Sequence, residues 1–137
     1  MCATMVVHHH GWGTTMLKLS LDACARQQLG AARTSSAGRA AHTVVGGHGN
    51  TMRQTVIALT GGRELGEHEN PGEATLVVLH GRVRLVSDSD AWDGRRGDLL
   101  VVPDARHRLE AVEDAVVLLT VAKTDRRGGD PKSGDQK

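Results

Sequence analysis

The sequence predicts an all-β domain of the sandwich or small-barrel type, preceded by a single helix. From His42 onward, the chain consists of short segments rich in Val, Leu and Ile, and Gly, Asp, Ser or Pro separates one segment from the next. Short strands at this spacing are typical of β-sandwiches and small barrels. The one stretch with convincing helical character lies upstream, over residues 21–33.

The predicted helix begins after Ser20, whose hydroxyl group can cap the first helical turn. Asp22 and Arg26 stand one turn apart, where opposite charges can pair. The sequence TSSAGRAA ends the helix. Three apolar residues recur on one face: Leu21, Ala25 and Leu29. Because this apolar stripe is narrow, we expect the helix to pack across a barrel or against a neighbouring subunit.

Several predicted strands show the period of two that places one face of a strand in a core. In RVRLV, Val83 and Leu85 point inward, whereas Arg82 and Arg84 point outward. The runs DLLVV and AVVLL are apolar throughout, so we expect them to be buried on both faces. Trp92 lies in a predicted hairpin, where it covers apolar surface at the barrel end or a subunit contact.

Residues 1–15 show no hydrophobic period, and Met16 opens a more regular sequence, so Met16 is the expected natural start and Met1 the alternative. The polar, glycine-containing tail is expected to be disordered. The predicted organisation has four parts: a disordered N-terminal extension (1–15), a helix and linker (16–40), a β-barrel domain (41–123) and a disordered C-terminal tail (124–137).

Composition excludes several classes of function. The net charge is +1, from 17 basic and 16 acidic residues that are interspersed, which gives no argument for binding nucleic acid or a membrane. No apolar run approaches the length of a membrane span. Cys2 and Cys24 make no disulfide framework, which fits a reducing compartment. We therefore expect a cytoplasmic protein.

Two motifs carry a family resemblance. GEHENPGEATLVVLHG covers residues 66–81, and GDLLVVPDARH covers residues 97–107. Together they resemble the motifs of the cupins, small jelly-roll barrels of the double-stranded β-helix type, and the resemblance covers residues 62–123. It implies a cupin barrel and a homodimer that pairs through a sheet edge. In a metal-binding cupin, three histidines and a glutamate from these motifs hold one divalent ion.

The resemblance places four metal-ligand positions on this sequence, and only two of them hold histidine. His68 and His107 match, whereas Asn70 replaces an imidazole and Ala74 occupies the carboxylate position. Glu73 is one residue early, so strand alternation directs it to the opposite face. Thus the resemblance supports the barrel more strongly than it supports a metal ion.

Three residues could complete a metal site with the two histidines. Glu73 would serve if the shortened turn shifts its strand, His80 lies on the same alternating face as Ala74, and His48 could reach over from a neighbouring segment. We assign a candidate metal set of His68, His107 and Glu73. It would hold one divalent ion, such as Fe, Mn, Zn or Ni.

Without a metal, the same residues make a polar lining for a small-molecule pocket. We assign its contacts to His68, Asn70 and His107, with Leu76 as an aliphatic contact. Two functions therefore stay open: a sensor or accessory protein that binds a small molecule, and a metal-dependent enzyme such as a dioxygenase or an isomerase. With one helix and a balanced charge, the chain lacks the part that would read DNA.

Overall fold

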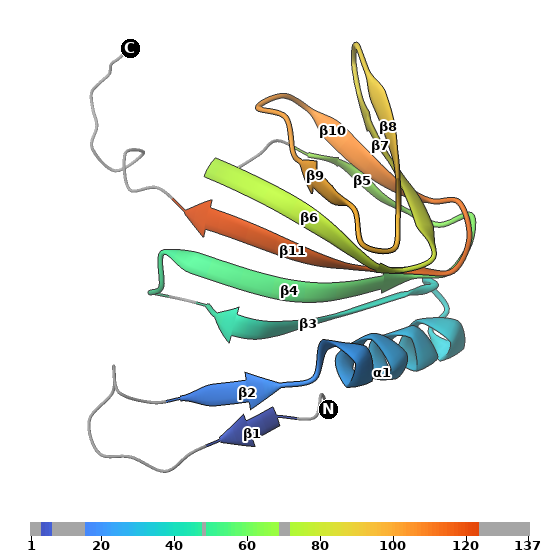
Figure 1. The fold of residues 1–137 in the computed structure, drawn as a ribbon. Coiled ribbons are helices and arrows are strands. Elements are labelled where there is room, and N and C mark those ends of the chain that lie inside the picture. The colour runs from blue at the N-terminus through green and yellow to red at the C-terminus, as the bar shows by residue number, and fades with distance from the viewer. Residues whose placement is uncertain (1–3, 7–15, 48, 69–71, 124–137) are drawn as a thin grey trace, which may run out of the picture.

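The computed structural model describes residues 4–6, 16–47, 49–68 and 72–123, with the backbone alone at 4–6, 67 and 68. One helix and eleven strands make up this part of the chain. Two antiparallel sheets face each other, and the helix lies beneath the larger one (Figure 1). The predicted all-β fold with one N-terminal helix is confirmed. Within the described residues, no helix has the length and apolar character needed to cross a membrane.

The larger sheet has five strands in the order β3 (Arg39–Gly46), β4 (Met52–Leu59), β11 (Ala115–Lys123), β6 (Gly72–His80) and β9 (Leu99–Val101). The smaller sheet has four strands in the order β5 (Glu64–His68), β10 (His107–Ala111), β7 (Arg82–Ser87) and β8 (Ala91–Arg95). The chain passes repeatedly from one sheet to the other, so sequence neighbours such as β6 and β7 lie in different sheets. This is the arrangement of a jelly-roll barrel.

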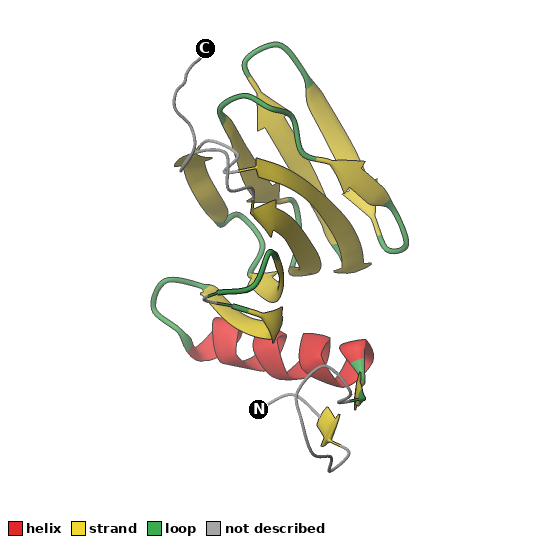
Figure 2. Cartoon of the chain, turned by 90° about the vertical axis from the view of Figure 1, so that its left-hand side faces the viewer, coloured by secondary structure: helices red, strands yellow, loops and turns green. Residues whose placement is uncertain are grey.

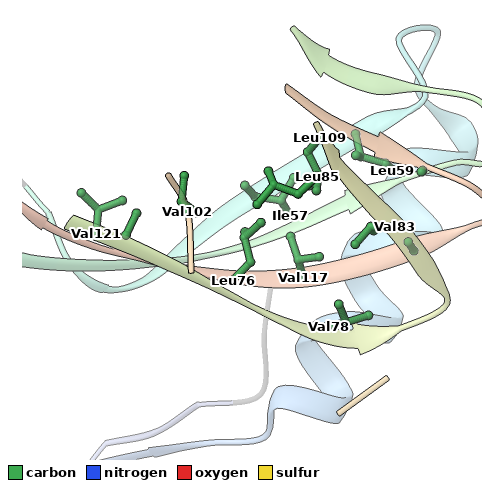
Figure 3. Close-up of a cluster of buried hydrophobic side chains, with 13 residues drawn as sticks. Ile57, Leu59, Leu76, Val78, Val83, Leu85, Val102, Leu109, Val117 and Val121 are labelled. Carbon is green, nitrogen blue, oxygen red and sulfur yellow. The ribbon is translucent and has the colours of Figure 1, made fainter. Parts of the chain in front are cut away.

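The core lies between the two sheets, and its described side chains include no aromatic residue. Figure 3 shows its aliphatic side chains packed between the strands, with Leu76, Val78 and Val117 from the larger sheet and Val83, Leu85 and Leu109 from the smaller one. Val83 and Leu85 are buried and Arg84 is exposed, as the period of two predicts.

The helix α1 (Leu21–Thr34) begins where predicted, because the Ser20 hydroxyl oxygen accepts a hydrogen bond of 3.1 Å from the Ala23 amide. It covers the outer face of the five-stranded sheet (Figure 2). Its buried side chains pack against the outward-facing side chains of β4 and β11, among them Val56, Ala58 and Val116. Val117 points into the barrel core instead, so the apolar run AVVLL is buried on both faces, as predicted.

One possible ion pair does not form, and one prediction about burial is wrong. The spacing of Asp22 and Arg26 allows them to pair, but in the described part of the chain neither has an oppositely charged partner within 4.0 Å. The run DLLVV is not buried on both faces, since Leu99 is 58% and Val101 72% exposed. The reason is that β9 is the edge strand of its sheet, and α1 packs on the outer face mainly over β3, β4 and β11, away from β9.

The predicted disordered extension over residues 1–15 contains one short strand. Its residues Thr4–Val6 form β1, which pairs with β2 (Leu17–Leu19) in a separate two-stranded sheet. The other residues of that range, and the predicted tail over 124–137, lie outside the described residues.

Candidate functional site

Antiparallel pairing brings the two sequence motifs together at one end of the smaller sheet. His107, the first residue of β10, is the Cα partner of His68, the last residue of β5. On its other side, His107 is the Cα partner of Ser87 in β7. One row of positions therefore crosses three neighbouring strands: Ser87, His107 and His68. We call it the histidine row.

The imidazole of His107 belongs to the inner face of the barrel. His107 is only 6% exposed, and alternation along β10 places it on the same face as the core residues Leu109 and Ala111. Its Nδ1 lies 2.8 Å from the carbonyl oxygen of Ala105. Because a carbonyl oxygen only accepts hydrogen bonds, Nδ1 carries the proton. In the neutral ring with this tautomer, Nε2 is the nitrogen that carries the lone pair, the atom through which a histidine accepts a proton or binds a metal ion.

The carboxylate position of the cupin motif is apolar in this chain. Ala74 is 7% exposed and lies in the barrel core, opposite Val121 of β11. Glu73 is exposed and is paired with Ala122. The Val102 amide donates a 3.0 Å hydrogen bond to the Ala74 carbonyl oxygen, which helps to fix the orientation of β6 at this position. Glu73 therefore points away from the face that carries His107.

His80 does not share the inner face with Ala74, contrary to the expectation from simple alternation. A register shift in the pairing of β6 with β11 places His80 opposite Val116, which packs beneath α1. A bulge of this kind changes which face the following residues take. His80 is exposed and lines a hollow beside the helix.

The other predicted site residues divide into two groups. Leu76 is 4% exposed and lies in the barrel core, two residues from Ala74 on the same face of β6. Asn70 and His48 lie outside the described residues, and His68 is described by its backbone alone. Thus His107, Ala74 and Leu76 lie on the inner face of the barrel, whereas Glu73 and His80 are exposed on the outer face of β6.

The described side chains of this face do not form a metal site. In the described part of the chain, no group of three or more His, Cys, Asp or Glu residues could hold one. A divalent ion needs about three firm protein ligands. The described inner face supplies the His107 imidazole and, at the carboxylate position, only the methyl group of Ala74. These residues do not fit a metal on their own, so a complete site requires ligands beyond the described side chains.

Two small adjoining hollows open beside the histidine row, between the edge strands β8 and β9. One has a volume of about 320 Å³ and the other about 70 Å³; both are lined by Leu85, Trp92 and Val101. Ser87, from the histidine row, lines the smaller one. Sequence reasoning did not identify Ser87, because only the pairing of β7 with β10 places it beside His107. Trp92 was singled out, but its position beside this opening depends on its pairing with Leu85.

Comparison with known proteins places this geometry in a family. No family model and no curated protein matches the sequence. Solved structures do match its fold. A conserved protein of unknown function from Streptococcus pyogenes is 29% identical with a TM-score of 0.59, and the match covers 66% of this chain and 79% of that one.

A second match is an enzyme, and a third is a cupin protein. Salicylate 1,2-dioxygenase from Pseudoaminobacter salicylatoxidans is 22% identical with a TM-score of 0.61; the match covers 74% of this chain but 32% of the enzyme, so it shows the fold alone. An RmlC-like cupin protein from Desulfovibrio desulfuricans is 30% identical with a TM-score of 0.54, and the match covers 61% of this chain and 81% of that one. With both motifs paired in one jelly-roll barrel, the chain belongs to the cupin superfamily.

Proposed function

We propose that this cupin binds a small organic molecule at the opening of its barrel, in a sensor or accessory role and without a complete metal site. The observation that carries the proposal is the contrast between two positions of the inner face. His107 presents a buried imidazole whose Nδ1 is already bonded to Ala105, while Ala74 places a methyl group where a ligand carboxylate would stand. This face offers hydrogen bonds and apolar contact, the combination that small-molecule pockets use.

The surroundings of the histidine row indicate the chemistry of the ligand. Ser87 lines the smaller hollow, and we assign His107, His68 and Asn70 to the polar lining of the same opening. Leu85, Trp92 and Val101 line the adjoining hollow of about 320 Å³. That volume is near the lower limit for small-molecule sites, about 300 Å³. A compact ligand with one hydrogen-bonding group and an apolar body suits this arrangement.

A second candidate function is a metal-dependent dioxygenase or isomerase with His68 and His107 as ligands. Two observations favour it: these two residues are paired across β5 and β10, and Nδ1 of His107 is hydrogen-bonded to the carbonyl oxygen of Ala105. Metal-binding histidines usually donate their second ring N–H to such a group, which directs the other nitrogen to the ion. The remaining ligands would come from segments that include Asn70.

Metal content separates the two functions. The protein is purified from cells grown with added Fe, Mn, Zn and Ni, and bound metal is measured by elemental analysis for wild type, His107→Ala and His42→Ala. His42 is an exposed residue of β3 and serves as the matched control. A stoichiometric ion that disappears only in His107→Ala would overturn the first proposal.

Thermal shift measurements complete the test, since any ligand that binds only the folded state raises its stability. We expect the melting temperature to be unchanged by divalent ions and to rise with a metabolite of the class described. That rise should be lost in His107→Ala and kept in His42→Ala. A protein stabilised by divalent ions and by none of the metabolites supports the enzyme instead.

A further inference from the structure

One hollow in the described part of this protein lies outside the barrel. It has a volume of about 520 Å³ and runs between α1, the end of β6 and the turn that joins β8 to β9. The described side chains of the histidine row, Ser87 and His107, do not line it, and the five-stranded sheet lies between it and the barrel core. We call it the helix groove.

The floor of the helix groove is apolar. Ala25 and Leu29 of α1 are 8% and 6% exposed, and Leu79 of β6 packs beside them. These side chains leave a hollow because α1 lies over β3, β4 and β11, and the sheet continues past the helix into β6. An apolar part of a ligand would therefore be removed from water at this floor.

The rim of the helix groove is cationic. Three arginines and one aspartate line it: Arg26, Arg33, Arg96 and Asp22. The Nε of Arg33 donates a 2.9 Å hydrogen bond to the carboxylate of Asp114. Among the described residues, Arg26 and Arg96 have no carboxylate within 4.0 Å. The whole chain carries a net charge of only +1, so this concentration of unneutralised guanidinium groups is local.

The backbone holds Arg96 in place opposite the helix. The Gly97 amide donates to the Val78 carbonyl oxygen at 2.9 Å, and the Val78 amide donates to the Asp98 carbonyl oxygen at 3.0 Å. The Arg95 amide also donates to the Asp98 carboxylate at 2.9 Å. The backbone of the turn that carries Arg96 is thereby fixed to β6. Binding of a ligand by Arg96 therefore does not include the entropy cost of ordering this backbone.

We propose that the helix groove binds a small organic anion, whose carboxylate or phosphate group pairs with Arg26 and Arg96 and whose apolar part rests on Ala25, Leu29 and Leu79. Guanidinium groups match the planar oxygens of carboxylates and phosphates in charge and in geometry. The volume of the groove lies within the range of small-molecule sites. This site is separate from the barrel opening and does not depend on the function proposed there.

Four probes distinguish the parts of this proposal: phenyl phosphate, benzoate, inorganic phosphate and benzyl alcohol. Each is titrated into ¹⁵N-labelled full-length protein while backbone amide shifts are followed. We expect phenyl phosphate and benzoate to shift the amides around Arg26, Leu29, Leu79 and Arg96, inorganic phosphate to shift them more weakly, and benzyl alcohol to leave them unchanged.

A double variant provides the decisive comparison. Arg26→Gln with Arg96→Gln should weaken phenyl phosphate binding at least about tenfold, because two charge-assisted contacts are removed. Arg84→Gln, which removes an exposed arginine outside the groove, should bind as wild type does. His107→Ala should also bind as wild type does, which separates this site from the barrel opening. Absence of saturable shifts, shifts centred on the histidine row, or equal affinity in the double variant would overturn the proposal.

Discussion

Nδ1 of His107 lies 2.8 Å from the carbonyl oxygen of Ala105, two residues earlier in the chain. The bond lies within the second cupin motif, so the orientation of the imidazole is set by its own turn and by β10. A ligand that meets His107 therefore meets a ring already oriented. Such preorganisation reduces the ordering cost of binding.

The first prediction concerns the proton of this ring. Since the Ala105 carbonyl accepts from Nδ1, neutral His107 should exist as the Nδ1–H tautomer. Two-bond ¹H–¹⁵N correlation spectra of the imidazole rings report the tautomer directly. The exposed His42 serves as a reference that averages between tautomers. A ring of His107 protonated at Nε2 in its neutral form would contradict this assignment.

The second prediction concerns the missing carboxylate. Ala74→Glu places a carboxylate on the inner face, and we expect it to cost about 3 kcal/mol or more, because the charge is buried without a partner. If His68 and His107 face the same space, millimolar Mn²⁺ or Zn²⁺ should recover part of that loss in denaturant unfolding experiments. Ala74→Gln has the same shape and no charge, so metal should not stabilise it.

Removing His107 tests whether the stability that metal restores to Ala74→Glu depends on the histidines. Ala74→Glu combined with His107→Ala should be no more stable with metal than without it. Equal responses of the Glu and Gln variants would show that residue 74 does not face the histidines.

The third prediction concerns the connection between the helix and the barrel. Asp114 accepts 2.9 Å hydrogen bonds from the Gly61 amide and from Arg33 of α1. The backbone hydrogen bond from Gly61, followed by the contact with Arg33, holds the pKa of Asp114 below its ordinary value of 3.8. The folded state therefore favours the carboxylate. Its stabilising effect is present above pH 3.8 and is lost as the pH falls through the lower pKa of the folded protein.

Asp114→Asn keeps an oxygen for the Gly61 amide but removes the charge. We expect a loss of about 1 kcal/mol or less at pH 7, because the Arg33 and Asp114 side chains are 55% and 38% exposed to screening solvent. The difference from wild type should shrink as the pH falls below the ordinary Asp value. Urea unfolding at several pH values measures it, with Asp88→Asn as an exposed control. A difference that stays constant with pH would contradict the assigned role of the charge.

The fourth prediction concerns self-association. Trp92, Leu99 and Val101 are 64%, 58% and 72% exposed, and β9 pairs with β6 on one side and has no second neighbour among the described strands. Exposed apolar side chains beside a free strand edge favour pairing with another chain. We expect a homodimer that buries this edge, and Val101→Lys should shift it toward monomer. Val112→Lys, at an exposed apolar residue elsewhere, should not. Size-exclusion chromatography with light scattering at micromolar concentration provides the test, and a monomeric wild type would contradict the prediction.

The barrel was predictable because strand alternation and turn residues are local properties of the chain. Val83 and Leu85 face the core and Arg84 faces solvent, as their spacing indicates. Glu73 lies on the opposite face from Ala74 for the same reason. The helix start at Ser20 was also predictable, since the capping hydroxyl and the helix it caps are sequence neighbours.

Other features depend on contacts between distant segments. Whether the outer face of an apolar strand is covered depends on where α1 packs. AVVLL therefore is buried on both faces, whereas DLLVV is exposed on the outer face of the edge strand β9. The face taken by His80 depends on a bulge opposite β11, which alternation along β6 alone does not reveal. The helix groove likewise combines residues from α1, β6 and the β8–β9 turn.

Periodicity in the sequence predicts the strands and their inward and outward residues, and the resemblance to the cupin motifs predicts the barrel type and the replacement of two metal-ligand positions by Asn70 and Ala74. Neither reveals that Ser87, His107 and His68 form one row of positions, or that an arginine-lined groove lies outside the barrel; these follow from the tertiary structure. This is because periodicity assigns each side chain only to a face of its own strand. Strand order and register then decide which faces meet, and they depend on pairing between segments that are far apart in the chain.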